Sequence, residues 1–218
     1  MIPRVKICCI SSIDEARMAI DAGASALGLV GYMPSGPGVI SDELIFQISK
    51  IVPPPIGTFL LTSETSVDEI IKHHKRTQTN TIQLVDALSR GTYKELRSAL
   101  PAIKIVQVIH VINEQSVDEA LEVSNHVDAI LLDSGNPNLL VKVLGGTGRT
   151  HNWKLSRTIC ESIRIPVFLA GGLNFENVRQ AIEDVQPFGI DLCSGVRTNG
   201  KLDQQKLDLL FDEIRKIS

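Results

Sequence analysis

Leu169-Ala170-Gly171-Gly172-Leu173-Asn174 and Asp191-Leu192-Cys193-Ser194-Gly195-Val196 are the two stretches that decide the fold of this chain. In each of them an apolar segment with the character of a strand runs directly into Gly-Gly or Ser-Gly. Glycine lets a ligand approach the backbone closely, and the N–H groups at the start of a helix attract anions. The pair Gly171 and Gly172, with the pair Ser194 and Gly195, therefore predicts a cradle for a phosphate. In a (β/α)8 barrel such a cradle often follows strands seven and eight.

Counting outward from these turns gives eight apolar segments, each followed by a helical pattern. The expected strands cover residues 4–10, 26–30, 57–61, 81–84, 104–109, 128–132, 166–170 and 189–193. The expected helices cover residues 12–22, 41–52, 66–75, 89–100, 116–124, 153–163, 174–185 and 202–217. Short apolar strands that alternate with helices indicate a parallel sheet with both faces covered. We therefore predict an α/β fold, a (β/α)8 TIM barrel, formed as a single domain by residues 1–218.

Two local patterns bear on this prediction. An open doubly wound sheet is the alternative fold, but its typical GxGxxG turn after the first strand is replaced here by Cys8-Cys9-Ile10-Ser11-Ser12. Capping-box spacing is expected to start three helices, at Ser12, Ser66 and Ser116, each with a glutamate three residues later.

Composition and charge narrow the function classes. The 218 residues include 43% hydrophobic side chains, enough for a sizeable core, and the net charge of −3 provides no general attraction to nucleic acid or anionic lipid. No apolar run reaches the roughly 18 residues that span a membrane, and the first residues lack the layout of a signal peptide. The four cysteines form no Cys-x-x-Cys pair, so we expect no metal, no cofactor and a reducing cytoplasmic location.

The first strand ends in a candidate base. Strand alternation places Lys6, Cys8 and Ile10 on one side, and it places Cys9 on the opposite, outer side. If Lys6 and Cys8 face the barrel interior, the ammonium group stabilises a thiolate that can act as a nucleophile or base. The alternative is that either cysteine is only a small buried apolar residue.

The sixth strand ends in a candidate acid. Asp133 emerges from the apolar run Ala129-Ile130-Leu131-Leu132, and partial desolvation raises the pKa of such a carboxyl group into the range of a general acid. The alternative is a carboxylate that only caps the following turn. Cys8 and Asp133 are expected to face each other across the barrel mouth.

A glycine-rich loop after the sixth strand is a candidate lid. Gly146, Thr147, Gly148 and Arg149 lie in it, and closure over a substrate would exclude water. A flexible surface loop is the alternative, and His151 is interpreted as an exposed loop residue.

The other histidines are placed by their expected elements. His73 and His74 are expected on a helix surface, and His126 at the far end of the barrel. His110, at the end of the fifth strand, is a candidate ligand contact.

These segments resemble the phosphoribosylanthranilate isomerase family of tryptophan biosynthesis. The resemblance spans nearly the whole chain in order, and its pieces are Val5-Lys6-Ile7-Cys8, Ser12-Ile13-Asp14-Glu15-Ala16, Ala22 to Gly28, Leu131-Leu132-Asp133-Ser134, Gly145-Gly146-Thr147-Gly148 followed by Trp153, Leu169 to Leu173, Glu176-Asn177-Val178, Gly189-Ile190-Asp191 and Ser194-Gly195-Val196.

The resemblance implies an Amadori rearrangement of an aminoaldose phosphate to an aminoketose phosphate. The family acid, which matches Asp133, protonates the furanose ring oxygen, and the family base, which matches Cys8, removes the C2 proton. Backbone amides that match Gly171-Gly172 and Ser194-Gly195 hold the phosphate. The implied partner is therefore a small phosphosugar substrate.

Three departures from the family pattern stand out. The glycine that usually follows the family cysteine is Cys9, the usual arginine is missing from Ser35-Gly36-Pro37-Gly38, and the usual His-Gly after the fourth strand is Val85-Asp86. Arg149 is the nearest substitute for the missing guanidinium. Phosphoribosylanthranilate remains the leading substrate. The alternatives are a paralogue that isomerises another phosphosugar, or a barrel that binds phosphosugars without catalysis.

Overall fold

The computed structural model describes residues 2–34, 36–135 and 152–217, and in them eight parallel strands close into a barrel in the order β1-β2-β3-β4-β5-β6-β7-β8. The strands are β1 (Arg4–Ile7), β2 (Ala26–Val30), β3 (Gly57–Thr62), β4 (Thr81–Leu84), β5 (Lys104–His110), β6 (Ala129–Asp133), β7 (Val167–Leu169) and β8 (Gly189–Leu192). β1 pairs with both β2 and β8, which closes the sheet. The predicted (β/α)8 barrel is confirmed.

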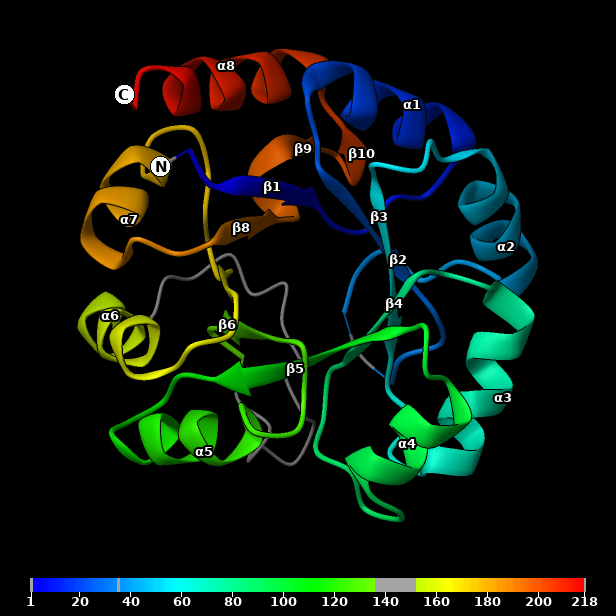
Figure 1. Cartoon of the computed structure of the whole chain (residues 1–218). Helices are drawn as coiled ribbons and strands as arrows, with labels where there is room; N and C mark the ends of the chain where they lie inside the picture. Colours follow the sequence, from blue (N-terminus) through cyan, green and yellow to red (C-terminus); the bar gives the residue numbers. More distant parts are fainter. Residues whose placement is uncertain (1, 35, 136–151, 218) are drawn as a thin grey trace.

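A helix follows each strand, and the helices form the outer ring that Figure 1 shows around the barrel. They are α1 (Ile13–Ala22), α2 (Asp42–Ile51), α3 (Val67–Thr77), α4 (Tyr93–Ala99), α5 (Gln115–Val123), α6 (Trp153–Ser162), α7 (Val178–Val185) and α8 (Gln204–Arg215). After β8 the chain adds a 3₁₀ turn, η1 (Ser194–Val196), and a hairpin of β9 (Arg197–Thr198) and β10 (Lys201–Leu202). The sequence pattern did not predict this hairpin.

Two apolar layers hold the barrel together. The larger one lies between the strands and the helices and contains fully buried side chains such as Ile7, Leu60 and Leu132. The smaller one fills the barrel interior, where Phe59 and Phe168 meet edge to face. Burial of a large apolar side chain contributes roughly 1.5–3 kcal/mol, so these layers dominate the stability of the fold.

The predicted capping boxes have three different outcomes. Ser12 caps α1 through the amide of Glu15, as predicted. Ser66 precedes α3 but its side chain makes no capping hydrogen bond. Ser116 lies inside α5, where its hydroxyl donates to the carbonyl of His110 and accepts from the amide of Ile112. Its hydroxyl is therefore used to hold the loop between β5 and α5, and the prediction at Ser116 is wrong.

Helix starts were the least well predicted boundaries. The helix expected from residue 89 begins at Tyr93, because Thr92 and Glu95 form a reciprocal capping box. The helix expected from residue 174 begins at Val178, after a turn held by Asn177. The last helix begins at Gln204, because the hairpin occupies the residues before it.

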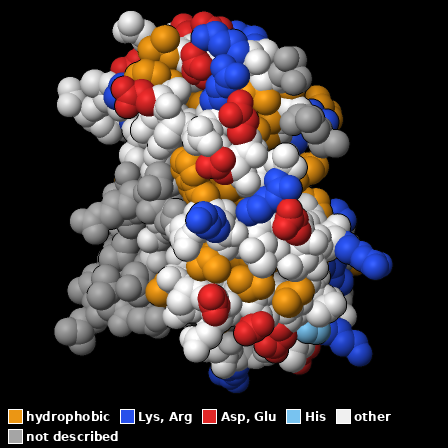
Figure 2. All heavy atoms as spheres, turned by 90° about the vertical axis from the view of Figure 1, so that its left-hand side faces the viewer, with side chains coloured by type: hydrophobic (Ala, Val, Ile, Leu, Met, Phe, Trp, Pro, Cys, Tyr) orange, Lys and Arg blue, Asp and Glu red, His pale blue; other side chains and the backbone are white. Residues whose placement is uncertain are grey.

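The outer surface mixes both signs of charge. On the side of the molecule shown in Figure 2, basic and acidic side chains alternate between apolar ones. Exposed helices carry ion pairs of their own, such as Arg157–Glu161 in α6 and Arg179–Glu183 in α7. Exposed pairs of this kind contribute about 0.5 kcal/mol or less each, so they add little to the stability. Within the described residues, no helix is both long and apolar enough to span a membrane.

Candidate active site

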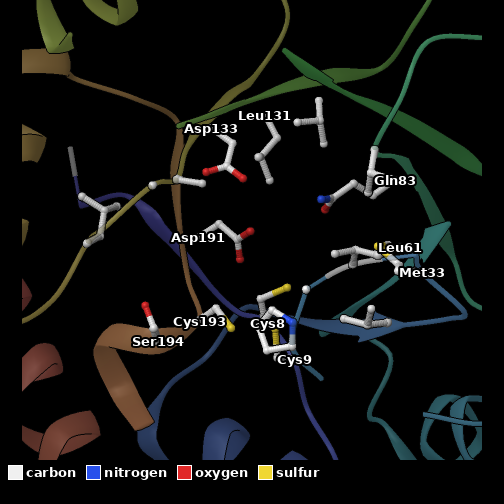
Figure 3. A pocket seen from close by; sticks show the side chains of 18 of the residues that line it. Cys8, Cys9, Met33, Leu61, Gln83, Leu131, Asp133, Asp191, Cys193 and Ser194 are labelled. Atoms are coloured by element: carbon white, nitrogen blue, oxygen red, sulfur yellow. The ribbon is translucent and has the colours of Figure 1, made fainter. Parts of the chain in front are cut away.

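The carboxyl ends of the strands surround one pocket, as expected for this fold. Each of the eight strands, or the residue just after it, lines the pocket, through Cys8, Val30, Leu61, Gln83, Val108, Asp133, Ala170 and Asp191 among others. Figure 3 shows the side chains of Cys8, Leu61, Gln83, Asp133 and Asp191 around this cavity. Both predicted catalytic residues are among them.

Cys8 lies beside the ammonium group of Lys6. A Cβ atom placed on Gly28 of β2 would lie 2.6 Å from the Cys8 Sγ and 3.0 Å from the Lys6 Nζ. Both polar atoms therefore occupy the space that a side chain at residue 28 would fill. Lys6 is completely buried, and it faces the interior as predicted.

Cys9 also faces the pocket, so its predicted place on the outer side of the strand is wrong. β1 ends at Ile7, and Cys9 adopts a left-handed φ of 61°, which interrupts the alternation of side chains. Ile10 accordingly belongs to the outer apolar layer, not to the side of Lys6 and Cys8. A left-handed residue with a Cβ costs roughly 1–2 kcal/mol, which explains why glycine is usual here in the family that the sequence resembles.

Asp133 lies on the far side of the pocket from Cys8 (Figure 3). It is 8% exposed, and one carboxylate oxygen accepts a 2.7 Å hydrogen bond from the amide of Ser134. Burial raises the pKa of Asp133 from 3.8 to about 6, and the nearby charge of Asp191 adds to the effect, while the Ser134 amide opposes it. The Asp133 carboxyl group therefore combines both features that the sequence offered as alternatives: it caps the following turn, and its pKa is raised.

Asp191 is the site residue that sequence reasoning missed. Its carboxylate lies 2.8 Å from the Lys6 ammonium group, and both side chains are buried. Burial lowers the pKa of Lys6, but the charge and hydrogen bond of Asp191, together with the nearby Cys8 and Cys9, outweigh this effect and raise the pKa above the usual value. The two residues are register partners on β1 and β8. A lysine that faces a barrel interior requires a counter-ion, and this requirement was the available signal.

The two predicted phosphate-binding turns meet at the pocket wall. Gly171 and Gly172 have φ values of 84° and 66°, and their amides donate to no acceptor among the described residues. The Asn177 side chain donates to the Gly172 carbonyl and holds this turn in place. Ser194 lines the same pocket. A Cβ on Gly195 would lie 2.0 Å from the Leu173 carbonyl oxygen, so the two turns touch only because residue 195 is glycine.

Arg197 holds the backbone that carries the two cysteines. Its guanidinium group donates to the carbonyl oxygens of Cys8 and Cys9, and to both carboxylate oxygens of Glu15. The Arg197 and Glu15 side chains are 7% and 10% exposed. Burial opposes ionisation of Glu15, but Arg197 and the amides of Leu202 and Ser11 lower its pKa below the usual range. β9 and α1 are thereby tied to the end of β1.

Several other predictions concern the glycine-rich segment that follows β6 in the sequence. Gly146, Thr147, Gly148, Arg149 and His151 lie outside the described residues. Their predicted roles therefore stay predictions.

The histidines lie in more buried places than expected. His73 and His74 are 4% and 8% exposed, so their predicted surface position is wrong. His73 is hydrogen-bonded to Thr62 and Asp42, and its burial in this network lowers its pKa. His110 lines a separate cavity above β5, and burial lowers its pKa as well. Its role as a ligand contact stays a prediction.

The departures from the family pattern also line the pocket. Gly36 and Pro37 form part of one wall, in the loop where the family that the sequence resembles usually carries an arginine. Val85 lies at the end of β4 in place of the usual histidine. The side of the pocket that faces away from the phosphate turns is therefore more apolar than the resemblance implies.

Comparisons with known proteins agree with this geometry. Residues 5–213 match the family model described as N-(5'phosphoribosyl)anthranilate (PRA) isomerase. An N-(5'-phosphoribosyl)anthranilate isomerase of Methanosarcina acetivorans is 36% identical and covers 97% of this chain and 93% of its own, and one of Microcystis aeruginosa is 34% identical and covers 98% of both.

Solved structures give the same result. The phosphoribosyl anthranilate isomerase of Thermotoga maritima superimposes with a TM-score of 0.81 at 31% identity, over 99% of this chain and 100% of that one. A similar enzyme, in complex with reduced 1-(o-carboxyphenylamino)-1-deoxyribulose 5-phosphate, has a TM-score of 0.78 at 29% identity, with the same coverage. The chain therefore belongs to the N-(5'-phosphoribosyl)anthranilate isomerase family.

Proposed function

We propose that this protein is an aldose–ketose isomerase that performs the Amadori rearrangement of phosphoribosylanthranilate in tryptophan biosynthesis, as one barrel domain over residues 1–218. The observation that carries the proposal is the buried Asp133 carboxyl, with a pKa raised to about 6, across the pocket from Cys8 in a member of this family. A carboxyl group with this pKa is protonated in part at neutral pH and can donate a proton.

Asp133 acts first in the proposed mechanism. It protonates the furanose ring oxygen, and the C1–O bond breaks as the nitrogen lone pair forms a Schiff base. The Ser134 amide, which bonds the same carboxylate, stabilises the charge that remains after the proton has left. The buried position keeps water from replacing the substrate as proton acceptor.

Cys8 acts second. Its sulfur removes the proton at C2 of the Schiff base, and the resulting enolamine tautomerises to the aminoketose. The Lys6 ammonium group lies beside this sulfur, at the place where the C2 proton is taken up. Asp191 neutralises part of that charge, and it fixes the position of Lys6.

The amides of Gly171, Gly172, Ser194 and Gly195 hold the phosphate in this proposal. The left-handed conformations at the first two residues and the close approach at the last one bring these backbone segments together at one wall of the pocket. The solved relative that contains a deoxyribulose 5-phosphate analogue supports a phosphosugar as the ligand. The four cysteines are unpaired, which supports a reducing cytoplasmic location.

A second candidate is the same isomerisation of another aminoaldose phosphate. The apolar wall formed by Gly36, Pro37 and Val85 favours it, because an anthranilate carboxylate needs a charged or hydrogen-bonding partner.

Turnover of phosphoribosylanthranilate by the purified protein tests the proposal, together with growth of a tryptophan auxotroph that lacks this step. Cys8→Ala and Asp133→Asn should each reduce kcat by two orders of magnitude or more, the size typical of a lost general acid or base. Cys160→Ala on α6 and Asp128→Asn near the other end of β6 are the matched controls. Near-normal activity of Cys8→Ala would remove the base from the proposal, and an Asp133→Asn enzyme with only a raised KM would show that another group is the acid.

A further inference from the structure

Three cysteines meet at one corner of the pocket. Cys8 and Cys9 follow β1, Cys193 follows β8, and these two strands are neighbours in the barrel, with Ile7 paired to Leu192. The Cys8 amide donates a 2.7 Å hydrogen bond to the Leu192 carbonyl, so the pairing continues to the cysteines themselves. Figure 3 shows all three side chains at this corner.

The conformation of Cys9 brings its side chain to the same pocket that Cys193 lines. The left-handed φ of 61° turns the side chain into the pocket, and Gly38 packs against it from the other side. A Cβ on Gly38 would lie 2.5 Å from the Cys9 Cβ and 3.1 Å from its Sγ. Cys193 packs against the buried interior cluster that contains Cys8 and Cys9, and all three residues line the pocket. Cys8 instead extends toward Gly28 and Lys6.

The two thiol groups differ in acidity. The hydrogen bond from Cys9, with help from the positive charges of Arg197 and Lys6, lowers the pKa of Cys193, although burial opposes this. The interactions of Cys9 with the thiols of Cys193 and Cys8, and its burial, raise the pKa of Cys9. Cys193 is therefore the more acidic thiol of the two. This division of roles is typical of an attacking and a resolving cysteine.

We propose that Cys9 and Cys193 are a redox pair that closes to a disulfide when the protein meets a hydroperoxide. The Cys193 thiolate attacks the peroxide, so that an S–O bond forms and the O–O bond breaks. A sulfenic acid results, and the hydroxide or alkoxide that leaves takes a proton from solvent. The Cys9 sulfur then attacks the Cys193 sulfur. An S–S bond forms, and the hydroxide that leaves takes the Cys9 proton as water. The two thiols supply the two electrons that reduce the peroxide, and an added dithiol reverses the bond.

Continuation of the β1–β8 register places Cys193 opposite Cys8, and Cys9 follows one residue further along. With neighbouring strands about 4.8 Å apart and a rise of about 3.3 Å per residue, a diagonal pair of this kind has a Cα separation of about 6 Å, which a disulfide can bridge. The bond would fasten the wall between Cys8 and Ser194, and so it would block the site of the proposed isomerase. This inhibition rests on the proposed function, whereas the bond itself does not.

Peptide mapping of the oxidised full-length protein tests the bond. The reduced protein is treated with hydrogen peroxide, its remaining thiols are alkylated, and it is digested with trypsin without reduction. We expect residues 7–17 and 180–197 to appear as one linked peptide, with a mass equal to the sum of the two peptides plus one alkyl group on Cys8, less two hydrogen masses for the disulfide. The peptide with Cys160, on the outer α6, should stay alkylated and serves as the internal control.

Serine variants identify which sulfur reacts. Cys8→Ser should retain the linked peptide, whereas Cys9→Ser should lose it and leave a sulfenic acid on Cys193 that dimedone traps. Cys193→Ser should lose the linked peptide too, so it tests the same bond if the Cys9 variant does not fold. A linked peptide that persists in Cys9→Ser, or no linked peptide in the unchanged protein, would overturn the proposal. Linked protein that turns over substrate as fast as before oxidation would refute the inhibition while the bond stands.

Discussion

The Asp133→Asn variant lacks the proposed acid, yet its free energy of unfolding should increase relative to that of the unchanged protein as the pH rises. The pKa of Asp133 is raised from 3.8 to about 6 on folding, chiefly by burial. A carboxyl group of this kind binds its proton more tightly in the folded state. Its ionisation therefore destabilises the fold above pH 6, and this penalty disappears below pH 4.

The magnitude follows from the shift. A difference of about 2 pKa units, at roughly 1.4 kcal/mol for each, amounts to about 3 kcal/mol. Asparagine keeps the shape and cannot ionise, so it escapes the penalty. The difference in unfolding free energy between the variant and the unchanged protein should therefore increase by about 3 kcal/mol in favour of the variant, most of it between pH 4 and pH 7.

Urea unfolding at one-unit steps from pH 4 to pH 8, followed by circular dichroism, measures this difference. Asp128→Asn is the control with the opposite sign. Burial opposes ionisation of Asp128, but the Ile105 amide with Arg97 and Lys104 lowers its pKa, so the unchanged protein should gain on that variant as the pH rises. Two parallel pH curves for Asp133→Asn and the unchanged protein would show that Asp133 ionises normally. The physical ground for its role as acid would then be lost.

Three further results are expected. Gly195→Ala should weaken the binding of inorganic phosphate at least about tenfold in calorimetry, because its Cβ would lie 2.0 Å from the Leu173 carbonyl oxygen; unchanged binding would place the phosphate elsewhere. Arg197→Met should cost about 3–5 kcal/mol of stability in urea unfolding at pH 8, because Glu15 stays charged and buried without its partner. A loss below about 1 kcal/mol would show that the bonds between Arg197 and Glu15 do not stabilise the fold. Arg149→Ala should reduce an activity on phosphoribosylanthranilate that is already weaker than in typical family members, and strong turnover that ignores this change would show that the substrate carboxylate is held by another group.

The barrel was predictable because its signals are local and repeated. Each strand is a short apolar run, and each helix has its own start and stop residues, so the order of elements needed no knowledge of contacts. The same locality explains the errors at the helix starts. Ser66-Val-Asp-Glu69 and Ser116-Val-Asp-Glu119 are identical in sequence. Yet Ser66 makes no capping bond, and Ser116 bonds to the end of β5, because the surrounding loops differ.

The site was predictable where chemistry and strand ends coincide, as at Cys8 and Asp133. It was not predictable where a single backbone angle sets the direction of a side chain, or where a partner distant in sequence gives a residue its role. Alternation fails at Cys9 because its φ is positive, which no pattern of apolar residues reveals. Asp191 acquires its role only through Lys6, its register partner in the closed barrel.

The hydrogen bonds of Arg197 to Glu15 and to the backbone of the two cysteines also constrain when the site can form during synthesis. The bonds to Glu15 join residues 182 positions apart. A ribosome makes the N-terminal end first. β1 and the two cysteines that follow it are therefore synthesised long before Arg197, whose guanidinium group bonds to their backbone. Contacts of such long range form late because the intervening chain must first lose its freedom. A nascent or prematurely released chain therefore carries Cys8 without its final backbone geometry, and catalytic competence arrives with the last βα unit.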